Sequence, residues 1–229
     1  ILGISAMSYG SLSKNAVEAL NLGAAKGGFY HNTGEGGIAP AHKLGGDLVW
    51  QIGTGYFGCR KADGGFDPQL FEQKSQLECV KMIELKLSQG AKPGKGGMLP
   101  GAKVTPEIAE IRGVPVGKDV LSPAGHVEFN DARGLLLFIK QLRDLSGGKP
   151  VGFKLCVGSQ IEVMEVFKQI EKTGIIPDFI TVDGAEGGTG AAPLEFANAV
   201  GMPLKDGLAL VSSLVEHHGL KNNVKVVAS

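Results

Sequence analysis

Glycine clusters follow the apolar runs of this chain, and this recurring order constrains the fold more than any other feature. Glycine accounts for 36 of the 229 residues, well above the average of about 7%. The clusters follow apolar runs at residues 29–32, 48–52, 82–87 and 179–183. Glycine allows backbone amides to approach a ligand without interference from a side chain. The order therefore indicates ligand-binding loops that follow buried strands.

The segment from Leu87 to Gly101 shows this order most clearly. It contains five glycines, two prolines and two lysines, a composition that excludes the interior of a helix or strand. Lys92 and Lys95 place positive charge where an anionic ligand would bind. A solvated surface loop is the competing interpretation, and the segment alone does not decide between the two.

The remaining patterns predict seven strands, mostly followed by helices. The strands cover roughly residues 1–6, 29–32, 48–52, 82–87, 151–157, 179–183 and 224–228. Ser13 and Asn15 are both candidate caps for the first helix. This alternation predicts an α/β fold of the (β/α)8 TIM-barrel type, with the active face at the carboxyl ends of the strands. Because the eighth unit is missing, we expect residues 1–229 to form a single barrel domain, truncated after about strand seven.

Two other architectures fit less well. An open, doubly wound sheet gathers its ligand loops at one switch point, whereas five of the seven predicted strand ends here are glycine-rich. Residues 53–58 spell GxGxxG, but glycines and a proline follow at 64–68, where a dinucleotide-binding site requires a helix. Gly94 and Lys95 lack the Ser or Thr of a phosphate-binding loop. Both nucleotide motifs are therefore rejected.

Composition narrows the possible partners. Lysine plus arginine equal aspartate plus glutamate, 23 each, so no basic field is present to bind nucleic acid. No apolar run approaches the roughly 18 residues that a membrane span needs, so we expect no membrane contact from this segment. Three widely spaced cysteines without a CxxC motif indicate a reducing cytoplasm and argue against a disulfide framework or a metal cluster: Cys59, Cys79 and Cys156. The histidines lack the spacing of a metal triad, and no metal is assigned: His31, His42 and His126.

Six segments, in order and over essentially the whole chain, carry a resemblance to a known family. They read ISAMSYGSLS (4–13), NTGEGG (32–37), WQIGTG (50–55), QGAKPG (89–94), PG (100–101) and GGTGAAP (187–193). Together they resemble the FMN-binding synthase domain of glutamate synthase, and most closely the short glutamate synthase-like proteins. The resemblance implies an FMN-dependent oxidoreductase that reduces 2-iminoglutarate, formed from 2-oxoglutarate and ammonia, to L-glutamate.

The resemblance also implies partners outside this segment. Family members take electrons from NADPH or ferredoxin through iron-sulfur clusters, whose cysteines lie beyond the seventh strand together with the loops that hold the flavin phosphate. This chain departs from the larger enzymes at Lys95 and Met98, where those enzymes have acidic and amide side chains. The departure concerns the part of the site that would set the exact substrate.

Cofactor contacts are assigned on this resemblance. Ala6, Met7 and Ser8 are expected along the isoalloxazine edge, and Gln51 is expected to donate to the pyrimidine edge. Lys154 would place positive charge near flavin N1 and O2, although a buried stem with a solvated head is the competing interpretation. The sixth strand end is expected to face the flavin ribityl chain or the substrate through Asp183, Gly187, Gly188 and Thr189.

Substrate contacts follow from the dicarboxylate that the resemblance implies. Lys92 and Arg112 are the candidates to bind its carboxylates, with Gln89 as a neutral partner. Lys92 would also protonate or orient the imine nitrogen. Glu35 resembles the family's glutamate near the ammonia entry and would bind ammonium. A structural ion pair for Arg112 and a surface carboxylate for Glu35 are the competing interpretations.

Two other functions remain open at this stage. One is a different FMN barrel, such as a 2-hydroxy acid oxidase, which would need a histidine base and an arginine in the loop after the seventh strand, a region that the chain does not contain. The other is a non-catalytic barrel that binds a ligand or a partner.

Overall fold

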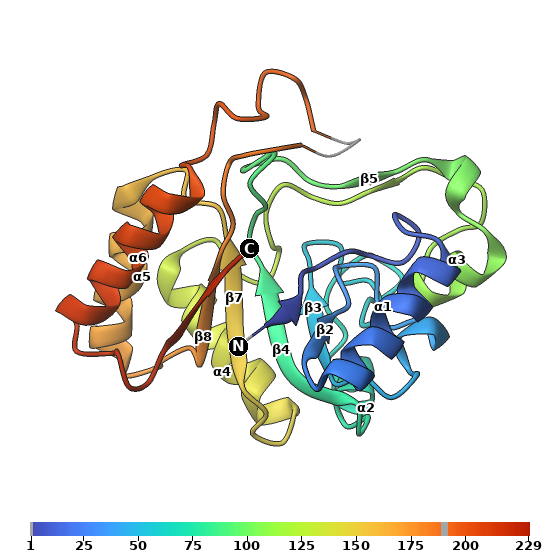
Figure 1. Ribbon diagram of the computed structural model, residues 1–229, viewed down its shortest axis with the longest axis horizontal. Coiled ribbons are helices and arrows are strands. Elements are labelled where there is room, and N and C mark those ends of the chain that lie inside the picture. The colour runs from blue at the N-terminus through green and yellow to red at the C-terminus, as the bar shows by residue number, and fades with distance from the viewer. Residues whose placement is uncertain (1, 189–191) are drawn as a thin grey trace.

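The chain forms a seven-stranded parallel sheet. The computed structural model describes residues 2–188 and 192–229 (Figure 1). The strands, in their order across the sheet, are β1 (Gly3–Ile4), β2 (Tyr30–Asn32), β3 (Leu48–Ile52), β4 (Val80–Lys86), β7 (Val151–Leu155), β8 (Phe179–Val182) and β9 (Lys225–Ala228). Every neighbouring pair runs parallel. All seven predicted strands are confirmed.

The sheet curls into a half-barrel whose two edges approach each other. Ser5, just after β1, and Ser229, just after β9, lie within hydrogen-bond distance, 2.8 Å between their hydroxyl oxygens. Both ends of the chain lie near the middle of Figure 1, in front of β4 and β7. This curvature brings the carboxyl ends of all seven strands to one rim.

Helices cover the outer face of the sheet. They are α1 (Lys14–Gly27), α2 (Pro68–Ser75), α4 (Ala132–Leu145), α5 (Gln160–Thr173) and α6 (Leu204–His217). The main core forms where α2, α4, α5 and α6 pack against the strands, through the fully buried side chains of Phe71, Leu136, Phe167 and Val211. These apolar faces exclude water from the outer side of the sheet.

Local signals explain how two of these helices begin. Ser13, not Asn15, caps α1, because its side chain accepts the Ala16 amide at 3.3 Å. The sequence reading missed α2, although Asp67 accepts the Leu70 amide at 3.0 Å and Pro68 occupies the first helical position. Aspartate followed by proline is a strong signal for the start of a helix. The helix is only eight residues long and follows a glycine-rich segment, which made it hard to predict.

An excursion over residues 87–131 lies across the carboxyl rim, at the top of Figure 1. It contains β5 (Met98–Leu99), η2 (Gly101–Lys103), α3 (Pro106–Arg112) and β6 (Val120–Leu121). The expectation that 87–101 contains no strand was wrong at its end, because Met98 and Leu99 pair antiparallel with Leu121 and Val120. A second apolar cluster holds the excursion to α1 and the β1 end through Tyr9, Val17, Leu99, Ile108 and Val120.

The inner face of the sheet is polar. Glu84 on β4 is 2% exposed, and its carboxyl oxygens accept hydrogen bonds from Asn32 (2.7 Å), Gln51 (2.7 Å) and Thr181 (2.6 Å). These donors come from β2, β3 and β8, so the carboxylate connects both halves of the curled sheet. Three hydrogen bonds offset the cost of burying the carboxylate.

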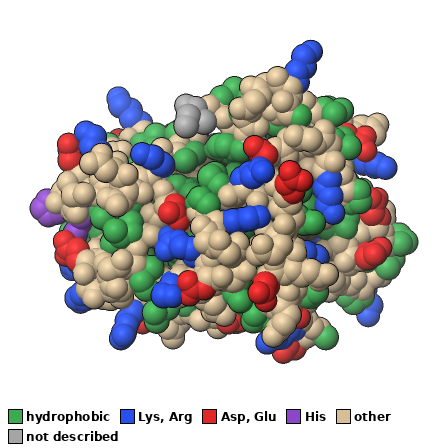
Figure 2. Space-filling view, turned by 90° about the horizontal axis from the view of Figure 1, so that it is seen from below, with side chains coloured by type: hydrophobic (Ala, Val, Ile, Leu, Met, Phe, Trp, Pro, Cys, Tyr) green, Lys and Arg blue, Asp and Glu red, His purple; other side chains and the backbone are tan. Residues whose placement is uncertain are grey.

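At the opposite end of the barrel, acidic and basic side chains are intermixed (Figure 2). No field of one sign covers that face, in keeping with the balance of charges in the sequence. Over the described ranges, no helix has the length and apolar character needed to cross a bilayer.

Two histidines are buried together beside α1. His31 and His42 are both 0% exposed, and their ring centroids lie 5.3 Å apart. The His42 Nδ1 accepts the Ala39 amide at 2.9 Å. Burial lowers the pKa of both imidazoles, and His31 also disfavours a charge on its neighbour, so the pKa of His42 falls to about 4. Both rings are therefore neutral at pH 7.

This pair predicts a loss of stability in mild acid. Between pH 6.5 and 4 the unfolded chain binds a proton at His42 that the folded chain does not, so the free energy of unfolding decreases as the pH falls, by on the order of 3 kcal/mol from this group. Urea unfolding from pH 7.5 to 4.5 should show a shallower pH dependence in His42→Gln. The exposed His217→Gln should keep the wild-type slope, and equal slopes for all three proteins would contradict the account.

Candidate active site at the carboxyl rim

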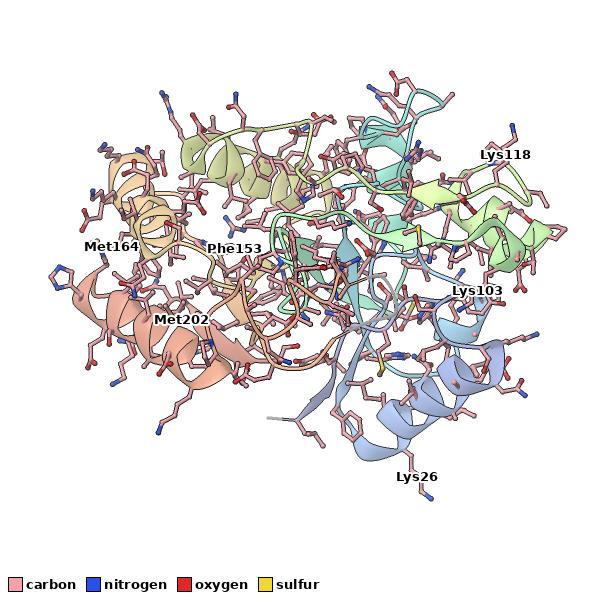
Figure 3. The ribbon with its side chains drawn as sticks, turned by 90° about the horizontal axis from the view of Figure 1, so that it is seen from above. Lys26, Lys103, Lys118, Phe153, Met164 and Met202 are labelled. Carbon is pink, nitrogen blue, oxygen red and sulfur yellow. The ribbon has the colours of Figure 1, made fainter. Side chains whose placement is uncertain are left out.

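A cavity of about 400 Å³ opens at the carboxyl rim, between the strand ends and the excursion. The excursion side carries Lys103 and the strand side carries Phe153 in Figure 3, which looks onto this rim. Eight of the predicted site residues line the cavity: Ala6, Met7, Ser8, Glu35, Gln51, Gln89, Lys92 and Arg112. The ends of β1, β2 and β3 and the excursion thus contribute to one hollow.

Glu35 lies at the centre of the polar contacts. Its carboxylate is 3.0 Å from the ammonium of Lys86, and both side chains are largely buried, 18% and 14% exposed. Burial alone would raise the pKa of the Glu35 carboxyl, but Lys86, Lys92 and Arg112 together lower it below its usual value. Glu35 is therefore a carboxylate at neutral pH.

Lys92 is 4% exposed and donates to the Gly96 carbonyl at 3.2 Å. Burial lowers the pKa of its ammonium, and the nearby charges of Lys86 and Lys95 lower it further, while Glu35 opposes them. A lysine with a lowered pKa releases its proton more readily than an exposed one. Lys92 can therefore serve as a proton donor as well as an anion ligand.

Arg112 ends α3 and reaches into the cavity from the excursion. It is 5% exposed, donates to the Tyr9 carbonyl at 2.9 Å, and its guanidinium lies 5.0 Å from the centre of the Phe57 ring. Its Nε is buried without a hydrogen-bond partner in the described part of the chain. Burial lowers the pKa of the Arg112 guanidinium. Because the reference value of arginine is high, the group still carries its charge. In the described part of the chain, the structural contact of Arg112 is thus a hydrogen bond to a backbone carbonyl and not the ion pair considered from the sequence. The binding role stays a prediction.

Gln51 lines the cavity from below, yet its amide nitrogen donates to Glu84 at 2.7 Å. One of the two side-chain N–H donors is therefore engaged within the barrel, which leaves the other N–H and the amide oxygen for a ligand. The expected donation to a flavin remains a prediction.

The remaining predicted residues lie outside this cavity. Lys154 and Asp183 contact each other, 3.5 Å between Nζ and Oδ2. The Gly187 amide donates to the Asn198 side chain at 2.9 Å, and Gly188 is exposed. Thr189 lies outside the described residues.

Three residues that line or support the cavity were not predicted from the sequence. Lys86 and Glu84 occupy alternate positions on β4 and therefore share the inner face. That alternation was the signal that could have revealed them. Lys103 lines the cavity from η2, and no pattern in the sequence distinguishes it from a surface lysine.

Charge is the dominant property of the cavity. Among the described residues that line it, Lys86, Lys92, Lys103 and Arg112 are cationic, and Glu35 is the carboxylate. Four positive charges against one negative charge favour a small anion with more than one carboxylate. Across residues 2–188 and 192–229, no group of three or more His, Cys, Asp or Glu side chains is placed to hold a metal ion.

Comparison with known proteins decides the family. The family model for the conserved region in glutamate synthase matches residues 1–229. The chain belongs to the glutamate synthase family. Its relatives include the glutamate synthase large subunit-like protein YerD of Bacillus subtilis, 48% identical over 100% of this chain and 44% of that protein. The archaeal-type glutamate synthase [NADPH] of Thermotoga neapolitana is 36% identical over 98% of the chain and 41% of its own length.

The chain thus spans about two fifths of these glutamate synthase relatives. Among solved structures, a protein described as a deoxyribose-phosphate aldolase of Coccidioides immitis aligns with a TM-score of 0.53 at 11% identity, over 98% of this chain and 70% of that one. At this identity the likeness concerns the fold alone. It agrees with a curled parallel sheet of the barrel kind.

The contact between Lys86 and Glu35 yields a prediction. Burial raises the pKa of the Glu35 carboxyl, and the positive charge of Lys86 lowers it. Lys86→Met removes that charge, so the pKa of the Glu35 carboxyl should rise relative to the wild-type protein. Titration of the carboxyl carbon by ¹³C NMR measures this pKa directly. Lys81→Met is the matched control, because Lys81 lies on the same strand with its side chain 50% exposed. A Glu35 pKa that stays unchanged in Lys86→Met would show that this ion pair does not control the carboxylate.

Proposed function

We propose that this chain is the flavin- and substrate-binding part of an oxidoreductase that reduces 2-iminoglutarate, formed from 2-oxoglutarate and ammonia, to L-glutamate. The observation that carries the proposal is the cavity in which four cationic side chains and one carboxylate meet at the carboxyl rim. Membership of the glutamate synthase family supports it. The activity, substrates and partners are proposed for the whole protein, of which this chain is a part.

The rim fits an FMN cofactor. Ala6, Met7 and Ser8 line the cavity, and a Cβ at Gly34 would lie 2.5 Å from the Ser8 amide nitrogen. Main chain therefore packs directly on main chain at this strand end, and we propose that the flavin ring lies there. When bound, FMN would supply the hydride for the reduction.

Other residues of the chain would complete the cofactor site. Gln51 would contact the flavin from below the rim, Lys154 would supply positive charge, and the β8 end would contribute further contacts. The residues proposed there are Gly187, Gly188 and Thr189. The phosphate-binding loops of such barrels follow the last two strands, so we propose that segments outside this chain complete both the barrel and the cofactor site.

The substrate carboxylates would be bound by Lys92 and Arg112. Arginine and carboxylate can form two parallel hydrogen bonds, and Arg112 lines the cavity while one terminal nitrogen donates to the Tyr9 carbonyl. Gln89 would add a neutral hydrogen bond, although its Oε1 accepts from Lys86 at 2.9 Å. Binding both ends of a five-carbon diacid fixes the carbon between them for reduction.

Proton transfer would involve the two central side chains. Glu35, held as a carboxylate by Lys86, would bind ammonium and accept a proton from it. Lys92, whose pKa is lowered, would donate a proton from Nζ to the nitrogen of the substrate. Glu35 would thus be the proton acceptor and Lys92 the proton donor, and both line the same cavity.

Electrons would come from a donor outside this chain. NADPH, named for the Thermotoga relative, or ferredoxin are the candidates, by way of iron-sulfur clusters in other parts of the full-length protein.

The test uses the full-length protein with its flavin reduced by light. Adding 2-oxoglutarate and ammonium should reoxidise the flavin and form glutamate, and both products can be measured. Reoxidation without glutamate would favour a different FMN barrel, such as a 2-hydroxy acid oxidase. No reoxidation by any oxo acid would favour a non-catalytic barrel.

Lys92 provides a specific prediction. A charged hydrogen bond to a buried group contributes about 1.5–3 kcal/mol, so Lys92→Met should weaken 2-oxoglutarate binding by about 10-fold to 150-fold. Lys95→Met is the control, because Lys95 belongs to the same loop and is exposed. Isothermal titration calorimetry measures both affinities. Similar losses in the two variants would mean that the loop, rather than the Lys92 ammonium, is responsible.

A further inference from the structure

The loop that carries Gln89 and Lys92 is attached to the ends of β7 and β8. The Leu87 amide donates to the Lys154 carbonyl at 2.8 Å. The Ser88 hydroxyl accepts the Cys156 amide at 2.9 Å and donates to the Cys156 carbonyl at 3.3 Å. These contacts fix the beginning of the loop, just before it enters the cavity.

Asp183 provides the next attachment point. Its Oδ2 accepts the Gly90 amide at 2.9 Å and lies 3.5 Å from the ammonium of Lys154. Lys154 also donates to the Ser229 hydroxyl at 3.0 Å. A Cβ at Gly90 would overlap the Gly184 carbonyl oxygen, so the loop packs directly against the main chain that follows Asp183. Only glycine permits this approach.

The position of the Lys154–Asp183 pair shows whether Asp183 contacts a ligand in the cavity directly or positions the loop. Among the described residues, neither Lys154 nor Asp183 lines the cavity, and their side chains are 7% and 19% exposed. The carboxylate of Asp183 is thus engaged by a main-chain amide and a lysine. A group engaged in this way acts on the site through the loop that it holds.

We propose that Asp183 is a positioning residue that fixes Gln89 and Lys92 in the cavity through the Gly90 amide. This inference rests on the proposed function, since it gives Asp183 a role in substrate binding in place of a direct flavin contact. Gly90 follows Gln89 directly, and the Lys92 amide donates to the Gln89 carbonyl at 3.2 Å, so a shift at Gly90 moves both side chains. Residues 90–97 include four glycines, and such a segment has a high entropy cost of ordering unless it is held.

Hydrogen-deuterium exchange in the full-length protein tests the attachment without any catalytic readout. In Asp183→Ala, peptides that cover residues 87–95 should exchange about tenfold faster or more, because a charged hydrogen bond is lost. Asp183→Asn keeps an oxygen that can accept the Gly90 amide, so it should retain most of the protection. Glu72→Ala, at an exposed position on α2, should exchange like the wild-type protein.

Binding measurements on the same variants test the consequence. Asp183→Ala should raise the Kd for 2-oxoglutarate about tenfold or more while leaving the Kd for FMN within about twofold, and Asp183→Asn should restore much of the 2-oxoglutarate affinity. Gly90→Ala disturbs the same contact from the loop side and should reproduce the loss. It serves as the second variant if Asp183→Ala does not fold.

Two results would overturn the proposal. One is unchanged exchange at residues 87–95 in Asp183→Ala, and the other is a lost FMN affinity with normal exchange, which would make Asp183 a flavin ligand. A wild-type protein that does not bind 2-oxoglutarate would refute the proposed function. The exchange measurement would then still decide whether Asp183 holds the loop.

Discussion

A buried carboxylate connects the two halves of the curled sheet. Glu84 on β4 receives hydrogen bonds from Asn32 and Gln51 on one side and from Thr181 on β8 on the other. An unpaired carboxylate in this place would be costly, so each donor must remain within reach. The curl of the sheet is therefore coupled to a polar contact inside the barrel, in addition to the apolar packing outside it.

The curl, in turn, produces the site. Because parallel strands end at the same edge, bending the sheet gathers Glu35, Gln51 and Lys86 around one hollow, and the excursion adds Lys92 and Arg112 from above. Charges that would be screened in open solvent interact strongly when they are buried together. Burial and the neighbouring lysines lower the pKa of the Lys92 ammonium. Burial would raise the pKa of the Glu35 carboxyl, but Lys86, Lys92 and Arg112 lower it, so this group is a carboxylate at neutral pH.

Sequence reasoning identified the strands because apolar runs and glycine clusters are local signals. It placed Glu35 and Lys92 in one site because family motifs surround them. It did not find Lys86 or Glu84, since their partners lie on other strands and the contacts depend on how the sheet bends. Asp183 illustrates the same limit, because its partner Gly90 lies 93 positions away in the sequence. Local patterns specify elements, whereas the pairing of side chains across the barrel requires the fold.

The proposed function requires that the cationic cavity bind a diacid more tightly than a monoacid. The most direct measurement compares the binding of 2-oxoglutarate with that of 2-oxopentanoate, which has the same number of carbons but a methyl group in place of the distal carboxylate. Calorimetry on the full-length protein should show at least about tenfold tighter binding of 2-oxoglutarate, since a charged contact is lost in the analogue. Equal affinities for the two compounds would contradict the proposed function.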